Sequence, residues 1–223
     1  MIDYAARAVP WRLVLAGCLV TTALMAIVAV SPDTMWPLQG TAIGLLAGLA
    51  AWSMDETAAA LVDALPRPLA WRTAARALGI VPLALTWCAS VLTVAGRLPP
   101  HTSLFLLQGT GAMLFAVACV TWRRAHGNAV PGTAFASCVV PLVALLAITR
   151  PLPQHLALFP IWSDESWHLC LVIWSTLAGG SAALLTAALS PGSSGMRCDA
   201  SSGVPARAVH AAVQSAKVRR HRH

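Results

Sequence analysis

The chain has 223 residues, of which 57% are hydrophobic and only 10% are charged, and its mean hydropathy is +0.70. A soluble globular domain carries about 25% charged residues, so this composition excludes that class and indicates a membrane protein. The formal net charge is +7, but the basic residues lie at the ends of apolar runs and in the C-terminal tail. This placement favours contact with membrane lipids, and no nucleic-acid partner is expected.

Six long apolar stretches, almost free of charge, fill most of the chain. They are Leu13–Val30, Leu38–Met54, Ala77–Ala95, Ser103–Trp122, Ala129–Ile148 and Trp167–Leu189. A helix rises 1.5 Å per residue, so roughly 20 residues cross a hydrocarbon core of about 30 Å. The sequence therefore predicts an all-α polytopic membrane protein with six transmembrane helices. The first stretch is too long for the apolar region of a typical signal peptide, and we expect it to be retained.

The distribution of basic residues predicts the orientation of these helices. Thirteen of the fifteen Lys and Arg residues fall on one predicted side of the membrane, and only Arg97 and Arg150 fall on the other. Positive residues favour the cytoplasmic side, so both termini are predicted to be cytoplasmic. The basic residues on that side are Arg7, Arg12, Arg67, Arg72, Arg76, Arg123, Arg124, Arg197, Arg207, Lys217, Arg219, Arg220 and Arg222.

Residues 1–12 form a short cytoplasmic or interfacial N-terminus, and residues 13–189 form the predicted transmembrane domain. Within it, Gly40, Gly44 and Gly48 recur at every fourth position of the second crossing. This spacing places the three glycines on one helix face, where they allow the backbone of another helix to approach closely. The partner helix lies either in the same chain or in another subunit.

The cytoplasmic connection over residues 55–76 is the most distinctive segment between crossings. Asp55 and Glu56 suit the N-terminus of a short helix, because the helix dipole favours negative charge there. The segment is interpreted either as a membrane-surface loop or as a docking element for a cytoplasmic partner. The candidate docking residues are Asp55, Glu56, Leu61, Leu65, Trp71, Arg72 and Arg76.

Two further segments lie outside the crossings. Residues 150–167 combine three prolines with an apolar run too short to span a bilayer, which is typical of a re-entrant or interfacial segment on the external side. Residues 190–223 are first rich in Ser and Gly and then basic, and we expect a flexible cytoplasmic tail that attracts anionic lipid or stays in solvent.

The sequence lacks the residues that several functional classes need. No charged residue lies in the middle of a crossing, which disfavours ion-coupled carriers, and no P-loop string is present to bind ATP. We find no catalytic pair and no spacing typical of a metal site, so we expect no catalytic, cofactor-binding or metal-binding residues. The six cysteines are scattered and are interpreted as small buried side chains. Gln108 is interpreted as a helix–helix hydrogen-bonding group, with a substrate contact as the alternative.

Six crossings, two cytoplasmic ends and the absence of an ATPase motif resemble the permease subunit of type-2 ATP-binding-cassette exporters. That family typically has a coupling helix in the second-to-third connection, where this chain has residues 55–76. It also typically has short external re-entrant helices between the fifth and sixth crossings, where this chain has residues 155–167. The family usually has a longer amphipathic helix before the first crossing than the residues available here allow.

The resemblance implies a bacterial inner-membrane (plasma-membrane) protein that is not itself an enzyme. A separate cytoplasmic ATPase subunit would dock on residues 55–76, and a second permease subunit, identical or different, would complete the path. The uncharged crossings favour a hydrophobic or amphipathic substrate. The alternative hypothesis is an accessory or scaffolding integral membrane protein that binds partners through Gly40, Gly44 and Gly48 and the basic tail. An intramembrane enzyme is the third hypothesis, and no visible catalytic pair supports it.

Overall fold

The computed structural model describes residues 7–55, 68–98, 100–128, 130–149, 158–160 and 166–190, with the side chain of Trp36 left aside. Over these residues the chain is helical and contains no strand. The contacts divide the chain into residues 1–189 and residues 190–223, and only the first unit is described below. The predicted tail, residues 190–223, lies outside the described residues except for Ser190.

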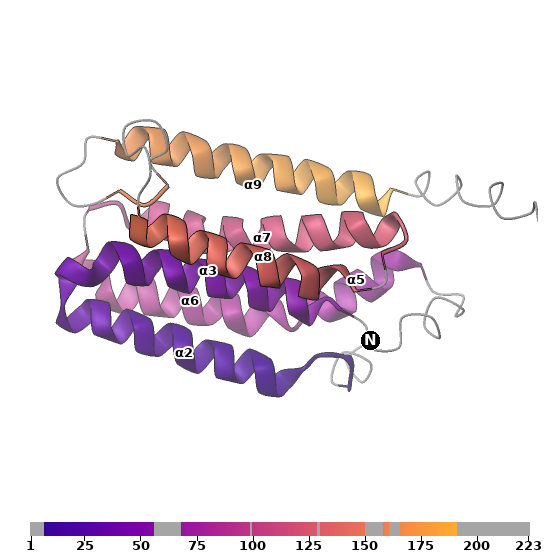
Figure 1. Ribbon diagram of the computed structural model, residues 1–223, viewed down its shortest axis with the longest axis horizontal. Helices are drawn as coiled ribbons and strands as arrows, with labels where there is room; N and C mark the ends of the chain where they lie inside the picture. The colour runs from indigo at the N-terminus through magenta and orange to yellow at the C-terminus, as the bar shows by residue number, and fades with distance from the viewer. Residues whose placement is uncertain are drawn as a thin grey trace, which may run out of the picture. The chain divides into compact units, whose positions relative to one another are not determined.

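Long helices run side by side along the first unit (Figure 1). Short 3₁₀ turns follow two of them, and the short helix α5 leads directly toward α6. The elements are α2 (Trp11–Val30), η1 (Pro32–Thr34), α3 (Met35–Ser53), α5 (Leu69–Ala77), α6 (Ile80–Val94), η2 (Ala95–Arg97), α7 (Thr102–Ala125), α8 (Pro131–Thr149) and α9 (Trp167–Leu189).

Five helical segments of the described chain are long and apolar enough to cross a membrane. They are α2, the stretch Leu69–Arg97 that contains α5, α6 and η2, and the helices α7, α8 and α9. The helix α3 has 19 residues but is not among them. Its glycines, together with Pro37, Gln39 and Thr41, keep its hydropathy below that of the most apolar windows of the five segments. The five apolar segments are compatible with a multi-pass membrane protein.

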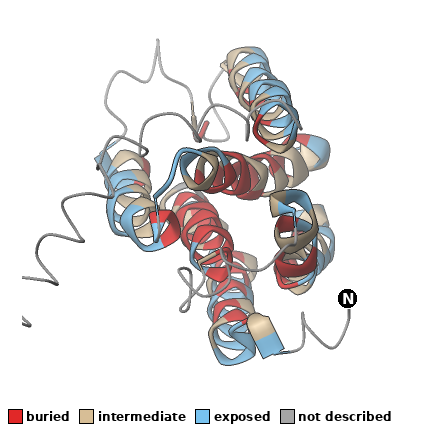
Figure 2. Cartoon of the chain, turned by 90° about the vertical axis from the view of Figure 1, so that its right-hand side faces the viewer, coloured by how far each residue is buried: buried red, intermediate tan, exposed pale blue. Residues whose placement is uncertain are grey.

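Although α3 is less apolar, it lies at the centre of the bundle. It packs against α2, α7 and α8, and its residues Ala42, Leu46 and Ala50 are completely buried. Figure 2 shows that buried residues concentrate on the central helices, while the outer helices carry exposed faces. Because neighbouring helices cover α3, its surface does not need the apolar composition that contact with lipid requires.

The helix α7 is the second central element, and it is the most buried of the five apolar segments. The indole of Trp87 on α6 is fully buried, and its Nε1 donates a hydrogen bond to the carbonyl oxygen of Phe105, 3.1 Å away. Gly109 lies one turn further along α7, and a Cβ at this position would overlap the indole ring. The absence of a side chain at Gly109 thus lets α6 and α7 approach closely.

The start of the third apolar stretch differs from the sequence-based expectation. For residues 55–76 we expected a short helix near Asp55 or a membrane-surface loop, followed by one crossing helix from Ala77. The structure instead has the amphipathic helix α5 from Leu69 and a break at Leu78 and Gly79 before α6. Pro68, in an extended conformation with ψ 149°, precedes α5. A Cβ at Gly79 would lie 2.6 Å from Val9, so the N-terminal segment packs closely against this break.

Candidate functional site

The glycine stripe of α3 lies against α8. A Cβ at Gly40 would overlap the methyl group of Ala147, one at Gly44 would lie 3.0 Å from Val143, and one at Gly48 would overlap Val140. All three glycines thus contact a helix of the same chain, and α3 and α8 approach closely along their length. This face is covered, so it does not offer a surface to another protein as the scaffolding hypothesis requires.

The carboxylate of Asp55 connects the end of α3 to the beginning of α8. Its Oδ1 accepts a hydrogen bond from the backbone N–H of Gly132 at 2.7 Å. Its Oδ2 accepts one from the backbone N–H of Thr133 at 2.6 Å and one from the Thr133 hydroxyl at 2.7 Å. The first N–H groups of a helix lack intrahelical partners, and the helix dipole favours negative charge near them. Asp55 therefore caps α8 across 77 residues of sequence.

The buried side chain of Arg76 joins α5 to the end of α3. Its Nη1 donates to the carbonyl oxygen of Ser53 at 3.3 Å and also to the carbonyl oxygen of Asp55. The last carbonyl groups of a helix lack intrahelical partners, so this guanidinium satisfies groups that α3 leaves open. Asp55 and Arg76 are thus close together, but the carboxylate bonds to α8 while the guanidinium bonds to backbone.

The remaining candidate docking residues divide into two groups. Trp71 and Arg72 lie on α5 and are half-buried. Glu56, Leu61 and Leu65 lie outside the described residues.

A buried polar network lies at the opposite end of the bundle. The amide Nε2 of Gln39 on α3 donates to Oε1 of Gln108 on α7, and both side chains are buried. The Nε2 of Gln108 donates to the carbonyl oxygen of Leu158 at 3.1 Å and contacts Sγ of Cys170 on α9 at 3.2 Å. The helix–helix hydrogen bond predicted for Gln108 is confirmed, and the network ties three helices together.

The same network holds part of the predicted external segment, of which residues 158–160 and 166–167 are described. The carbonyl oxygen of Leu158 also accepts a bond from Nε1 of Trp174 at 3.1 Å. The next residue, Phe159, is buried, and its ring lies 6.3 Å from that of Trp174 and against Gly40. The segment is therefore anchored in the bundle at Leu158 and Phe159.

Loss of one amide from this network is expected to destabilise the bundle. The substitution Gln108→Leu would leave the buried amide of Gln39 without its partner, which costs about 1–3 kcal/mol of unfolding free energy. Replacing both glutamines by leucine should recover much of this loss, because no buried donor then lacks an acceptor. Thermal unfolding of the wild type, both single variants and the double variant in detergent measures the coupling. Additive losses would show that the two amides do not form a pair.

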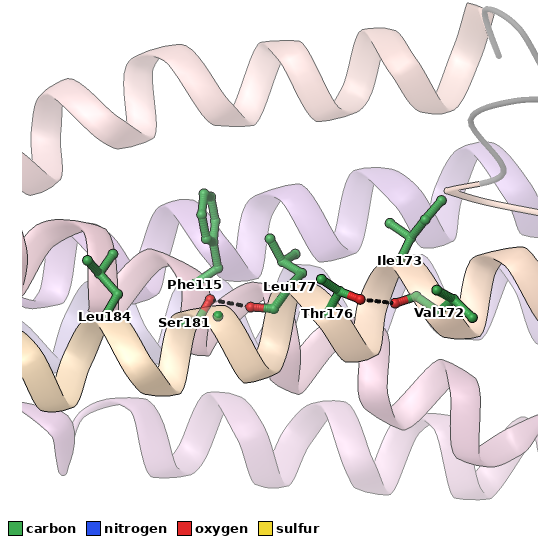
Figure 3. A pocket seen from close by; sticks show the side chains of 8 residues that line it. Phe115, Val172, Ile173, Thr176, Leu177, Ser181 and Leu184 are labelled. Carbon is green, nitrogen blue, oxygen red and sulfur yellow. Dashed lines mark hydrogen bonds between the residues drawn. The ribbon is translucent and has the colours of Figure 1, made fainter.

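An apolar groove runs along α9 (Figure 3). Its volume is about 660 Å³, and it is lined by Phe115 of α7 and by Ile173, Leu177 and Leu184 of α9, whose side chains project to the same side. The hydroxyl of Ser181, which also lines the groove, donates to the carbonyl oxygen of Leu177 in its own helix at 2.6 Å. The groove thus offers apolar surface with no unsatisfied hydroxyl at Ser181.

Several residues of these sites were not singled out from the sequence. Gln39 lies at the start of the second apolar stretch and carries the same amide group as Gln108. A polar side chain inside an apolar stretch could have predicted its helix–helix hydrogen bond. Thr133 and Cys170 gave no comparable signal, because their roles depend on tertiary contacts with Asp55 and Gln108.

No family model, curated protein or solved structure matches this chain. Within the described residues, no group of three or more His, Cys, Asp or Glu side chains is placed to hold a metal ion.

Proposed function

We propose that the chain is the six-crossing permease subunit of an ATP-driven bacterial exporter, with both termini in the cytoplasm. Its 19-residue helix α3 is about 28 Å long at 1.5 Å per residue, which approaches the thickness of the hydrocarbon core. Because neighbouring helices cover α3, its composition is compatible with a crossing. If α3 is counted as a crossing, the chain crosses the membrane six times. Both termini then lie on the same side, as the predicted orientation requires.

The contacts at the two ends of the bundle support this alternation. At one end, Asp55 after α3 bonds to the start of α8, and Arg124 near the end of α7 lines a cavity with residues of α5. At the other end, Arg97 after α6 donates to the carbonyl oxygen of Ala29 near the end of α2. Most of the described arginines belong to the first of these ends, which we assign to the cytoplasm.

The observation that carries the proposal is the attachment of residues 55–76 at both of their ends. The carboxylate of Asp55 fixes the start of this segment to α8, and Arg76 fixes its end to α3. An ATPase subunit that grips the segment would therefore act on two helices that pack closely together. We propose that ATP binding and hydrolysis shift the population between inward-open and outward-open states through this connection.

The substrate class and the second subunit follow from the lateral surface. The apolar groove beside Phe115 and Leu177 suits a hydrophobic or amphipathic substrate. In addition, α9 leaves Gly179 and Gly180 open, because no described atom outside the local backbone of α9 and the adjacent residues lies within 4 Å of the place that a Cβ would take at either residue. Small exposed residues let transmembrane helices approach closely, so this side of the bundle suits a second permease subunit.

Association with an ATPase tests the proposal. Charged substitutions at three predicted docking positions, Leu61→Asp, Leu65→Asp and Trp71→Asp, are expected to abolish co-purification of a P-loop ATPase with the tagged protein in mild detergent. The matched control is Trp122→Asp, which changes a partly exposed tryptophan near the end of α7 instead. Mass spectrometry of the co-purified proteins provides the measurement. Equal recovery of the ATPase from the triple variant and the wild type would contradict the coupling role.

A further inference from the structure

A backbone carbonyl from outside the helices receives three hydrogen bonds at the predicted external end. The carbonyl oxygen of Leu158 accepts from Nε2 of Gln108 on α7 at 3.1 Å and from Nε1 of Trp174 on α9 at 3.1 Å. The thiol of Cys170, one turn earlier on α9, donates to the same oxygen at 3.4 Å. A carbonyl oxygen has two lone pairs, so these three donors, here called the donor set, exceed what one backbone carbonyl needs.

The donor set is also held by contacts that do not involve Leu158. The helices α7 and α9, which carry it, pack against each other. The Oε1 of Gln108 accepts a hydrogen bond from the buried amide of Gln39 on α3, and its Nε2 also contacts Sγ of Cys170 at 3.2 Å. These contacts orient the donors independently of the oxygen that they bind, as a preorganised binding site requires.

The residue after Leu158 fills an aromatic slot, formed by Gly40 and Trp174, beside the donor set. Phe159 is buried, and its ring lies 6.3 Å from that of Trp174. Two of its ring carbons would lie 3.3 Å from a Cβ at Gly40, so the missing side chain of this glycine leaves room for the ring. The donor set and the aromatic slot together match a carbonyl group that is followed by an aromatic side chain.

The group that fills both places comes from a short non-helical piece of the chain, residues 158–160. If these residues left, Nε1 of Trp174 and one N–H of Gln108 would lose the acceptor that they share. An unsatisfied buried donor costs about 1–3 kcal/mol. Departure therefore becomes favourable when another molecule brings a carbonyl oxygen to the same place.

We propose that the donor set and the aromatic slot form a binding site for an apolar peptide, and that residues 158–160 are its built-in occupant. The built-in occupant reads Leu-Phe-Pro, so the site fits a peptide carbonyl that precedes an aromatic residue. The donors are an amide, an indole and a thiol, which suit a neutral carbonyl better than a charged group. As the substrate class of an exporter this inference rests on the proposed function, whereas binding itself needs no ATPase.

Binding of the radiolabelled tripeptide N-acetyl-Leu-Phe-Pro-amide to the purified full-length protein in detergent tests the site. In the wild type the built-in occupant competes with this probe, so binding is expected to be weak. Phe159→Ala weakens the built-in occupant without changing a donor, and it should raise the affinity for the probe by about tenfold or more. Trp174→Phe, added to Phe159→Ala, keeps an aromatic wall but removes the indole donor, and it should lower that affinity by about tenfold.

The matched control adds Trp87→Phe to Phe159→Ala. It also removes a buried indole donor, but one that bonds to Phe105 between α6 and α7. This control should keep the probe affinity of Phe159→Ala. A melting temperature shows that each variant is folded, and Phe159→Leu, which should also raise the affinity, takes the place of Phe159→Ala if the latter does not fold.

Equal probe affinity in the wild type and in the folded Phe159 variant would overturn the proposal, as would an equal loss of affinity from Trp174→Phe and Trp87→Phe. Displacement of the probe by dioleoylglycerol but not by unlabelled tripeptide would assign the site to a lipid ester and overturn the peptide assignment. No ATPase takes part in this measurement. Binding of the probe by a protein that co-purifies with no ATPase would therefore support the site while contradicting the exporter, and the two failures remain distinguishable.

Discussion

Replacing Gly132 with alanine is expected to separate α8 from α3. A Cβ at Gly132 would overlap the backbone carbonyl oxygen of Ala51 and lie 2.8 Å from both its carbonyl carbon and Oδ1 of Asp55. A backbone group cannot rotate away as the end of a flexible side chain can, so one helix must move. Overpacking of this kind costs about 1–3 kcal/mol. We expect a correspondingly lower melting temperature in detergent.

The matched control is Gly179→Ala on α9, where no described atom outside the local backbone of α9 and the adjacent residues lies within 4 Å of the position of a Cβ. This substitution is expected to leave the melting temperature unchanged or to raise it, because alanine favours a helix over glycine by about 1 kcal/mol. Gly48→Ala should fall between the two, since its Cβ would meet a side-chain methyl group of Val140 rather than backbone. Equal melting temperatures for Gly132→Ala and Gly179→Ala would contradict the close approach of α3 and α8.

The long apolar helices could be predicted from the sequence because hydrophobicity and length are local properties. The predicted stretch Ser103–Trp122 corresponds to α7, Thr102–Ala125, and the predicted stretch Trp167–Leu189 has the same bounds as α9. The break before α6 could not be predicted in this way. Gly79 at this break lies against Val9, and a contact between segments so far apart in the sequence is not visible in a local pattern.

The connections between helices were less accessible to sequence analysis. Asp55 was expected to favour a short helix in its own connection, on the ground that a helix N-terminus attracts negative charge. The same physical rule operates in the structure, but the helix is α8, whose first residues Gly132 and Thr133 are 77 and 78 positions away. Spacing along the chain does not reveal such a pairing, because it arises only when α3 and α8 pack together.

Loss of the Asp55 carboxylate is expected to have a comparably large effect. Asp55→Ala removes three hydrogen bonds from the start of α8 and leaves the backbone N–H groups of Gly132 and Thr133 without an acceptor. Hydrogen bonds to charged groups contribute about 1.5–3 kcal/mol, and loss of a helix cap typically costs about 1 kcal/mol. We therefore expect a loss of about 2–3 kcal/mol in unfolding free energy, measured by thermal or denaturant unfolding.

Asp55→Asn separates the role in stability from the proposed role in coupling. Asparagine keeps one acceptor oxygen for Gly132, but its NH₂ group cannot accept a bond from Thr133, so the stability loss should be smaller. The exposed Asp33 provides the control Asp33→Asn, which is expected to change neither property. If Asp55 transmits motion from an ATPase to α8, Asp55→Asn should retain the co-purified ATPase but change the ATP hydrolysis rate of the complex. An unchanged rate together with lower stability would restrict Asp55 to holding α8 against α3, and the connection to the ATPase would have to run through Arg76 instead.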